Sequence, residues 1–104
     1  FSGKKYDNEA RPQEFSDFKE VNDRTMGCLR TGSAALNLAY LADGRLGGCV
    51  GRFNKIWDVA AGFIIAELAG AKVDYKADKN ERFLLSYTAV VPQSESFLKN
   101  IVTL

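Results

Sequence analysis

Residues 57–71 read WDVAAGFIIAELAGA, and this stretch decides how the chain is interpreted. Asp58 stands before an apolar run in which Glu67 is the only other charge, so a buried helix is predicted from about Asp58 to Ala69. We expect Asp58 either to cap this helix or to offer its carboxylate to a ligand at the helix start. Trp57 is expected to be a core side chain or a pocket wall rather than a platform on which a base stacks.

A second stretch of the same kind lies upstream, at residues 30–46, and reads RTGSAALNLAYLADGRL. Ser33 is placed to cap a helix over 34–42, and Gly44 is placed to end it. Apolar residues occupy nearly every position, so this helix is also expected to be enclosed on most sides. A helix start presents unpaired N–H groups and a partial positive charge, which suits phosphate. A carboxylate at such a place, as at Asp58, alternatively suits a hard cation such as Mg²⁺.

The rest of the chain alternates between predicted helices and strands. The patterns predict a helix over 12–22, strands over 26–31, 49–53, 73–75 and 88–91, and a last helix capped by Ser94. The segment 44–51 has four glycines in eight residues, but no Lys-Ser/Thr follows, which favours a turn entering a strand over a phosphate loop. This alternation predicts an α/β layered sandwich with a mixed or mostly parallel sheet covered by helices.

Composition excludes several functional classes. The 104 residues carry 14 Lys+Arg and 13 Asp+Glu, and a net charge of +1 argues against a nucleic-acid partner. The absence of histidine excludes His–metal sites and Ser–His–Asp triads within this chain. Cys28 and Cys49 are too few for a disulfide framework and are expected to be small buried side chains.

No targeting or membrane segment is recognisable. The first twelve residues, FSGKKYDNEARP, contain no apolar core of a signal peptide. The most apolar stretch, 59–71, contains Glu67 and is shorter than the ~18 to 20 apolar residues that a membrane span needs. We therefore expect a cytoplasmic protein with no membrane partner.

The two helix starts together closely resemble the inositol monophosphatase family. Its C-terminal signature is W-D-x-A-A-G followed by a helix ending E-A-G-G, and residues 57–71 match it. Residues 30–46 resemble the family's segment G-S-A-A-L-x-L-x-x-V-A-x-G-R. The resemblance covers 30–104 well and the helix before it loosely. It implies that 1–104 is a single C-terminal phosphatase domain of this fold, with the N-terminal metal-binding domain outside this chain. The start at Phe1 rather than Met fits that expectation.

The resemblance implies a Mg²⁺-dependent, Li⁺-sensitive phosphomonoesterase. Its substrate would be a small phosphorylated polyol, sugar or nucleotide resembling inositol 1-phosphate, and metal ions would activate the attacking water. Asp58 would be the catalytic residue and metal ligand, lying near the leaving group. Gly32, Ser33 and Ala34 would contact the substrate together with Asp58. The complete protein would be a homodimer.

The departures from the family pattern concern the other metal ligands and the substrate. The family's remaining ligands, a Glu and an Asp-Pro-(Ile/Leu)-Asp-Gly-Thr motif, have no match here. We therefore expect the isolated chain to be inactive, to bind Mg²⁺ negligibly and to expose an apolar face for the missing N-terminal half.

Two further positions differ from inositol-type members. Gly51 stands where those members have a substrate-binding Glu, seven residues before Asp58. Leu29 stands where the family often has an Arg, with Arg30 beside it. These changes leave open another phosphorylated sugar, a nucleotide, or a non-catalytic relative that acts as a binding or dimerisation module.

Overall fold

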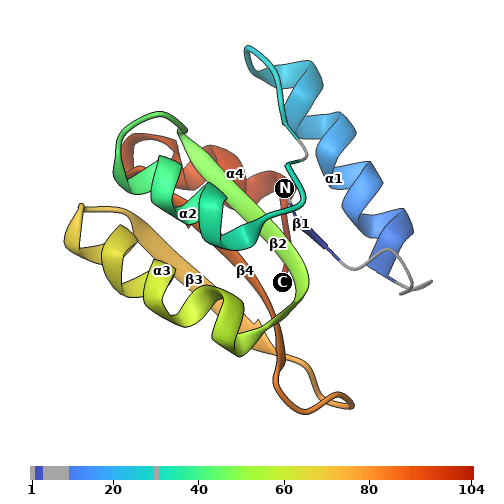
Figure 1. The fold of residues 1–104 in the computed structure, drawn as a ribbon. Helices are drawn as coiled ribbons and strands as arrows, with labels where there is room; N and C mark the ends of the chain where they lie inside the picture. Colours follow the sequence, from blue (N-terminus) through green and yellow to red (C-terminus); the bar gives the residue numbers. More distant parts are fainter. Residues whose placement is uncertain (1, 4–9, 30) are drawn as a thin grey trace.

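One four-stranded sheet with helices on both faces organises the chain (Figure 1). The structure is a computed structural model that describes residues 2–3, 10–29 and 31–104. The strand order is β1-β2-β4-β3, in which the strands are β1 (Ser2–Gly3), β2 (Gly48–Lys55), β4 (Leu84–Val90) and β3 (Lys72–Ala77).

The sheet is mixed. Strand β1 runs parallel to β2, whereas β2 and β3 both run antiparallel to β4. The predicted α/β sandwich with a mixed sheet is therefore confirmed. The alternative of a mostly parallel sheet is wrong for the described strands, because β3 and β4 form a hairpin and β4 returns beside β2.

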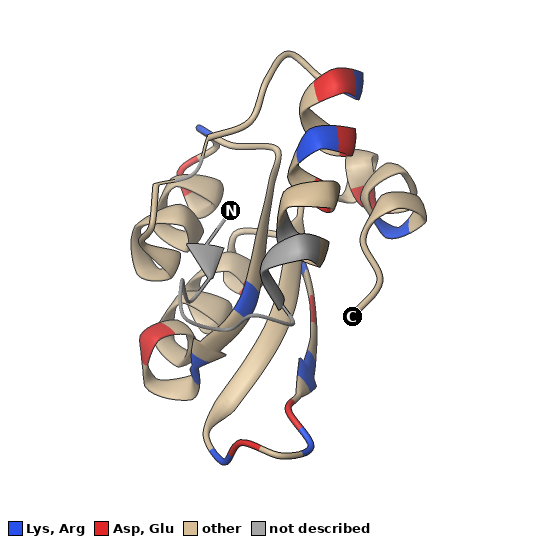
Figure 2. Ribbon diagram, turned by 90° about the vertical axis from the view of Figure 1, so that its right-hand side faces the viewer, with Lys and Arg blue, Asp and Glu red and all other residues tan. Residues whose placement is uncertain are grey.

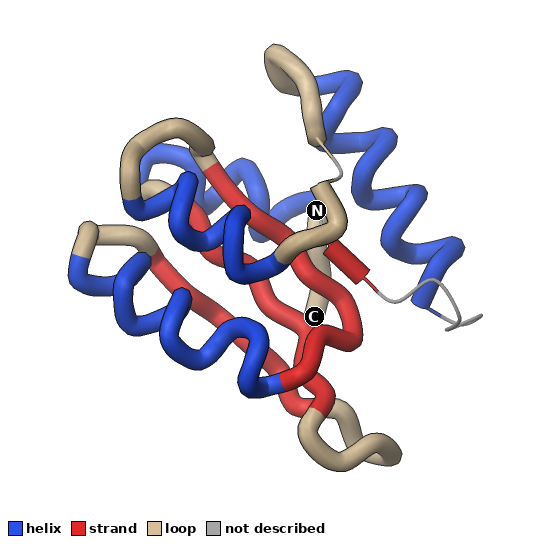
Figure 3. Tube along the Cα trace, in the orientation of Figure 1, coloured by secondary structure: helices blue, strands red, loops and turns tan. Residues whose placement is uncertain are grey.

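Two helices cover each face of the sheet (Figure 3). On one face α2 (Ala34–Ala42) and α3 (Ile56–Leu68) pack against side chains such as Tyr87 and Ala89 of β4. On the other face lie α1 (Ala10–Arg24) and α4 (Glu95–Ile101), which a short 3₁₀ turn η1 (Pro92–Ser94) precedes. We call the first the front face and the second the back face.

Helices α2 and α3 lie side by side and begin at the same end of the molecule (Figure 1). A Cβ atom added at Gly62 of α3 would lie 2.7 Å from Leu38 Cδ1 and 2.9 Å from Leu38 Cβ of α2. A glycine at this position therefore allows the close approach of the two helices. Their packing brings together the two helix starts that the sequence marked as functional.

The helix and strand predictions are largely confirmed, with boundaries that shift by a few residues. Helix α2 spans the predicted residues, and α1 extends the predicted helix at both ends. Helix α3 begins at Ile56, two residues before Asp58. Ser94 is the N-cap residue of α4 as predicted, but its side chain makes no capping hydrogen bond.

The predicted strand over 26–31 is wrong for its described residues. Side chains at and just after the end of α1 hydrogen-bond to this segment instead. Asn22 Oδ1 accepts from the Cys28 N–H at 3.0 Å, and Thr25 Oγ1 accepts from the Gly27 N–H at 3.2 Å. Gly27 also has a φ of +143°, which is outside the β region. These local bonds compete with strand pairing.

The front helices bury only one side each. In α3 the buried residues are Val59 and Ala66. Its exposed large apolar residues are Ile56, Trp57, Ile64, Ile65 and Leu68. The expectation of enclosed helices is thus wrong for this chain, and Trp57, 61% exposed, is not a core residue. The expected exposed apolar face is present. None of the described helices is long and apolar enough to cross a membrane.

Candidate functional site

The start of α2 is a fixed turn followed by a capped helix. Gly32 has a φ of +78°, a left-handed conformation that favours glycine. Ser33 follows in an extended conformation, and its Oγ accepts a hydrogen bond from the Leu36 N–H at 3.2 Å. The predicted capping role of Ser33 is confirmed. The Ser33 N–H donates to Thr31 Oγ1 at 3.3 Å, which holds the turn from the other side.

Two backbone donors are left at this helix start. The Leu36 N–H goes to the cap and the Asn37 N–H to the Ser33 carbonyl at 3.0 Å. The N–H groups of Ala34 and Ala35 have no hydrogen-bond partner among the described residues. The Ala34 side chain is buried, so this residue can meet a ligand only through its backbone. Such a pair of N–H groups suits phosphate oxygens.

The sequence interpretation did not name Ala35, whose N–H is also free at this helix start. The capping rule contains the signal, because one serine oxygen satisfies one N–H of the first turn and leaves its neighbours free. Ala34 was named from the family motif, and the capping rule indicates that the N–H of Ala35 is free as well.

Asp58 is an exposed residue in the first turn of α3. The N-cap of this helix is Lys55, which makes no side-chain capping bond, so the capping interpretation of Asp58 is wrong. The Asp58 carboxylate makes no hydrogen bond or ion pair with any described residue. It is therefore available to a ligand at the helix start.

Aromatic and backbone contacts hold the start of α3 in place. The Ile56 N–H donates to the Phe83 carbonyl at 2.9 Å, which attaches the helix start to the loop between β3 and β4. The Trp57 and Phe83 rings lie 5.9 Å apart, and Lys55 Nζ lies 5.3 Å from the Trp57 ring centroid. Charged residues gather on α1 and on the β3–β4 loop, whereas α2 and α3 carry few (Figure 2).

The described residues do not complete a metal site. They contain no group of three or more His, Cys, Asp or Glu side chains that could hold an ion. Asp58 fits as one oxygen ligand for Mg²⁺, and further ligands would have to come from elsewhere. Burial raises the pKa of the Cys49 thiol to about 12, and its Sγ donates to the Asn37 carbonyl at 3.2 Å, so Cys49 is a poor ligand or nucleophile.

The family model described as the inositol monophosphatase family matches residues 3–104. The chain belongs to this family. The solved structure of inositol monophosphatase from Anabaena is 33% identical with a TM-score of 0.80, and the match covers 96% of this chain and 40% of that one.

Two curated relatives of the chain carry names other than inositol monophosphatase. Fructose-1,6-bisphosphatase of Pyrococcus furiosus is 39% identical over 79 residues, covering 70% of this chain and 31% of the relative. Nus factor SuhB of Vibrio cholerae is 57% identical over 44 residues, covering 42% of this chain and 16% of the relative. The chain thus spans less than half the length of each of these family members.

Gly51 lies on the front face of β2, and the space beside it is filled. A Cβ atom added there would overlap Asn54 Oδ1 and Tyr87 Cε1 and would lie 2.9 Å from Tyr87 Cδ1. Leu29 is exposed, and Arg30 lies outside the described residues. The packing of Asn54 and Tyr87 therefore leaves no room for a side chain at position 51.

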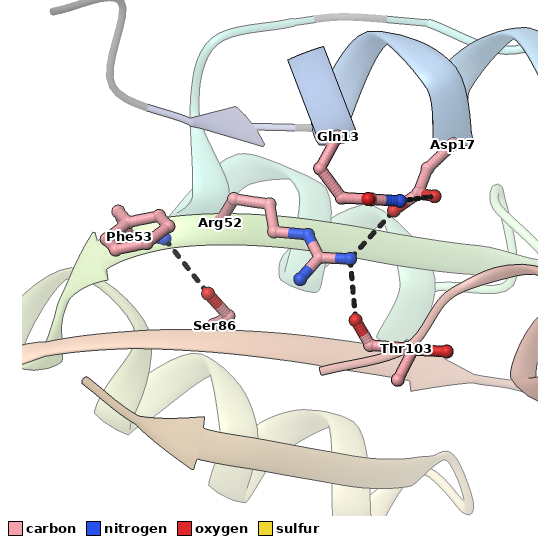
Figure 4. Close-up of polar contacts among 6 residues, drawn as sticks. All are labelled: Gln13, Asp17, Arg52, Phe53, Ser86 and Thr103. Carbon is pink, nitrogen blue, oxygen red and sulfur yellow. Dashed lines mark hydrogen bonds and ion pairs between the residues drawn. The ribbon is translucent and has the colours of Figure 1, made fainter. Parts of the chain in front are cut away.

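Arg52, the next residue, does not compensate for Gly51 on the front face. Its Nη2 donates to Asp17 Oδ2 of α1 at 2.8 Å and to the Thr103 carbonyl at 2.8 Å (Figure 4). Both partners belong to the back face. The Arg52–Asp17 pair is nine-tenths buried and joins α1 to the sheet and to the segment after α4.

Proposed function

We propose that this chain is the C-terminal part of a Mg²⁺-dependent phosphomonoesterase whose substrate is a small phosphorylated polyol, sugar or nucleotide. Membership of the inositol monophosphatase family supports the reaction class. The observation that carries the proposal is the exposed Asp58 carboxylate, which has no partner among the described residues and lies at the start of α3. The free N–H groups of Ala34 and Ala35 begin the neighbouring helix.

Each residue has a role that follows from its position. The Ala34 and Ala35 N–H groups donate to phosphate oxygens, while Gly32 and Ser33 fix the turn that aims them. Asp58 holds the metal ion and faces the leaving-group side of the ester. Bound Mg²⁺ supplies positive charge that polarises the phosphate and activates water.

The rest of the active site is proposed to lie in an N-terminal half that this chain does not include. One carboxylate cannot organise the metal ions, and the relatives are more than twice as long. In this proposal the apolar face of α2 and α3 packs against that half, and the complete cytoplasmic enzyme is a homodimer. The 104-residue chain alone is inactive.

The packing at Gly51 bears on the substrate. No acidic side chain can stand at this position without displacing Tyr87, which is fully buried. The proposed substrate therefore does not depend on a carboxylate at position 51 for recognition of its hydroxyl groups. A phosphorylated sugar, another polyol and a nucleotide all meet this condition.

Replacing Asp58 tests the proposal. In the natural protein, Asp58→Asn keeps the shape of the side chain and removes its charge. The kcat for a panel of phosphate monoesters with Mg²⁺ should fall by roughly a hundredfold or more, since even outer-shell partners of metal ligands contribute 10- to 100-fold. Asp74→Asn is the matched control, because Asp74 is an exposed carboxylate on β3.

Normal turnover of the Asp58→Asn enzyme would show that Asp58 is not a metal ligand. The chain by itself should show no turnover and no stoichiometric Mg²⁺ binding by calorimetry. Tight binding by the isolated chain would contradict the proposed division of ligands between the two halves.

A non-catalytic binding or dimerisation module is the second candidate. The glycine at position 51 and a relative named as a Nus factor favour it. It predicts that the natural protein has no Mg²⁺-dependent turnover on any ester of the panel and that Asp58→Asn leaves its self-association unchanged.

A further inference from the structure

An open hollow of about 230 Å³ lies on the back of the sheet, on the side opposite α2 and α3. It opens between β2, the β3–β4 hairpin and the last residues of the chain. Its polar lining consists of Arg52, Lys76, Asp78, Lys79, Asn80 and Ser86. Nothing in the proposed phosphatase function uses these residues.

The sheet register places the donors of this hollow in one row. Lys76 of β3 is paired directly with Ser86 of β4, so both side chains stand on the same face. Ser86 Oγ accepts a hydrogen bond from the Phe53 N–H at 3.2 Å, which leaves the Ser86 O–H to donate to a ligand. Arg52 of β2 continues the row across the sheet (Figure 4).

Arg52 is a buried cation with unused donors. Its side chain is 9% exposed, and both of its hydrogen bonds to described residues use Nη2. Nε has no partner in the described part of the chain. Figure 4 shows the second terminal nitrogen, Nη1, on the side of the guanidinium away from Asp17. Nε is shielded from solvent, so the donor that Arg52 can offer to an anion in the hollow is Nη1.

The side chains that line the hollow carry a net positive charge. Asp17 neutralises Arg52, but Lys76 and Lys79 form no ion pair with any described residue. The one side-chain carboxylate of the lining belongs to Asp78, whose Oδ2 accepts from the backbone N–H groups of Asn80 and Glu81. That oxygen shapes the hairpin turn and does not pair with either lysine.

We propose that this hollow binds a small oxyanion, either inorganic phosphate or the phosphate group of a small ester. Lys76 and Lys79 supply the charge, and the Ser86 hydroxyl and Arg52 Nη1 supply hydrogen bonds. The volume accommodates such an ion with several waters, since one water takes about 30 Å³. The site lies on the opposite face from Asp58 and is independent of the proposed catalytic function.

A titration of the natural protein with inorganic phosphate, followed by NMR in the presence of a chelator, tests this site. The chelator removes metal-dependent binding at the front face. The Ser86 and Asn80 amides should shift in a saturable way. Lys76→Gln and Lys79→Gln should each weaken binding roughly threefold, and together roughly tenfold. Lys72→Gln is the matched control, because Lys72 stands on the same strand and face but outside the hollow.

A second titration with glycerol phosphate identifies the source of the anion. Stronger binding of glycerol phosphate supports an ester as the ligand, and stronger binding of phosphate supports the free ion. Equal shifts with chloride at the same ionic strength would overturn the proposal, as would an unchanged affinity in the double lysine variant. Shifts confined to residues 32–36 would also overturn it, because phosphate would then bind only at the front helix start.

Discussion

Gly51 shows how one position constrains both stability and substrate. Because the neighbouring space holds Asn54 and Tyr87, Gly51→Ala should lower the free energy of unfolding by about 1–3 kcal/mol, as overpacking a core does. Gly51→Glu, which restores the residue of inositol-type members, should cost more and should not improve turnover of inositol phosphates. Urea unfolding measures the first effect and steady-state kinetics the second.

Gly47→Ala is the control for this pair, since a Cβ atom at Gly47 meets nothing within 4 Å. If Gly51→Ala were as stable as Gly47→Ala, the packing argument would fail. A gain of inositol phosphatase activity in Gly51→Glu would instead show that β2 can rearrange to present the carboxylate.

Cys49 predicts a specific loss of stability at alkaline pH. Burial raises its pKa from 9.0 to about 12, so the folded protein keeps the thiol protonated while the unfolded chain ionises it. Stability from this group is fully present below pH 9 and is lost as the pH rises toward 12. Unfolding curves across this range should show the decline, and Cys49→Ala should show a smaller one. Equal slopes in both proteins would refute the assignment.

Local chemistry explains which residues the sequence identified. Ser33 and Asp58 were found because a helix start has unpaired N–H groups and a preference for small polar residues, and these are properties of a few neighbouring positions. The Arg52–Asp17 pair was not found, because its partners are 35 positions apart and meet only after α1 docks on the sheet. The same holds for the hollow beside Arg52.

Among the elements, helices were predicted better than strands. A helix is specified by its own residues, so α2 was found with its cap and its end. Strand β2 contains a register irregularity between Gly51 and Asn54, and Phe53 has a φ of +54° within it. Such a bulge depends on the partner strand β4, so the pattern of β2 alone did not reveal it.

The segment after α1 was predicted as a strand that did not form, and here too the outcome depends on residues outside the segment. Residues 26–31 look like a strand by composition, but Asn22 of α1 and Thr25, just after the helix, hydrogen-bond to the following backbone. A strand prediction from the side-chain pattern does not include the side-chain-to-backbone hydrogen bonds that compete with strand pairing. The choice between a mixed and a mostly parallel sheet was open for a similar reason, because relative strand direction depends on which strands become neighbours.

The whole molecule presents an apolar surface that a complete protein would be expected to cover. Leu68 is 84% exposed, and Trp57 and Ile64 lie along the same side of α3, opposite the buried Val59 and Ala66. Exposed patches of this kind mark interfaces. On the proposed function, the N-terminal half packs here, so the effect of a charge at Leu68 depends on whether that half is present.

Leu68→Asp separates the two cases. In the 104-residue chain it should change the free energy of unfolding by less than about 0.5 kcal/mol, because the side chain is already in water, and it should reduce self-association. In the natural protein it should lower the melting temperature and the phosphatase activity, since an unpaired carboxylate would be buried. Met26→Asp is the control, as Met26 is fully exposed outside α3. If Leu68→Asp proved as harmless as Met26→Asp in the natural protein, the N-terminal half would have to dock on another face.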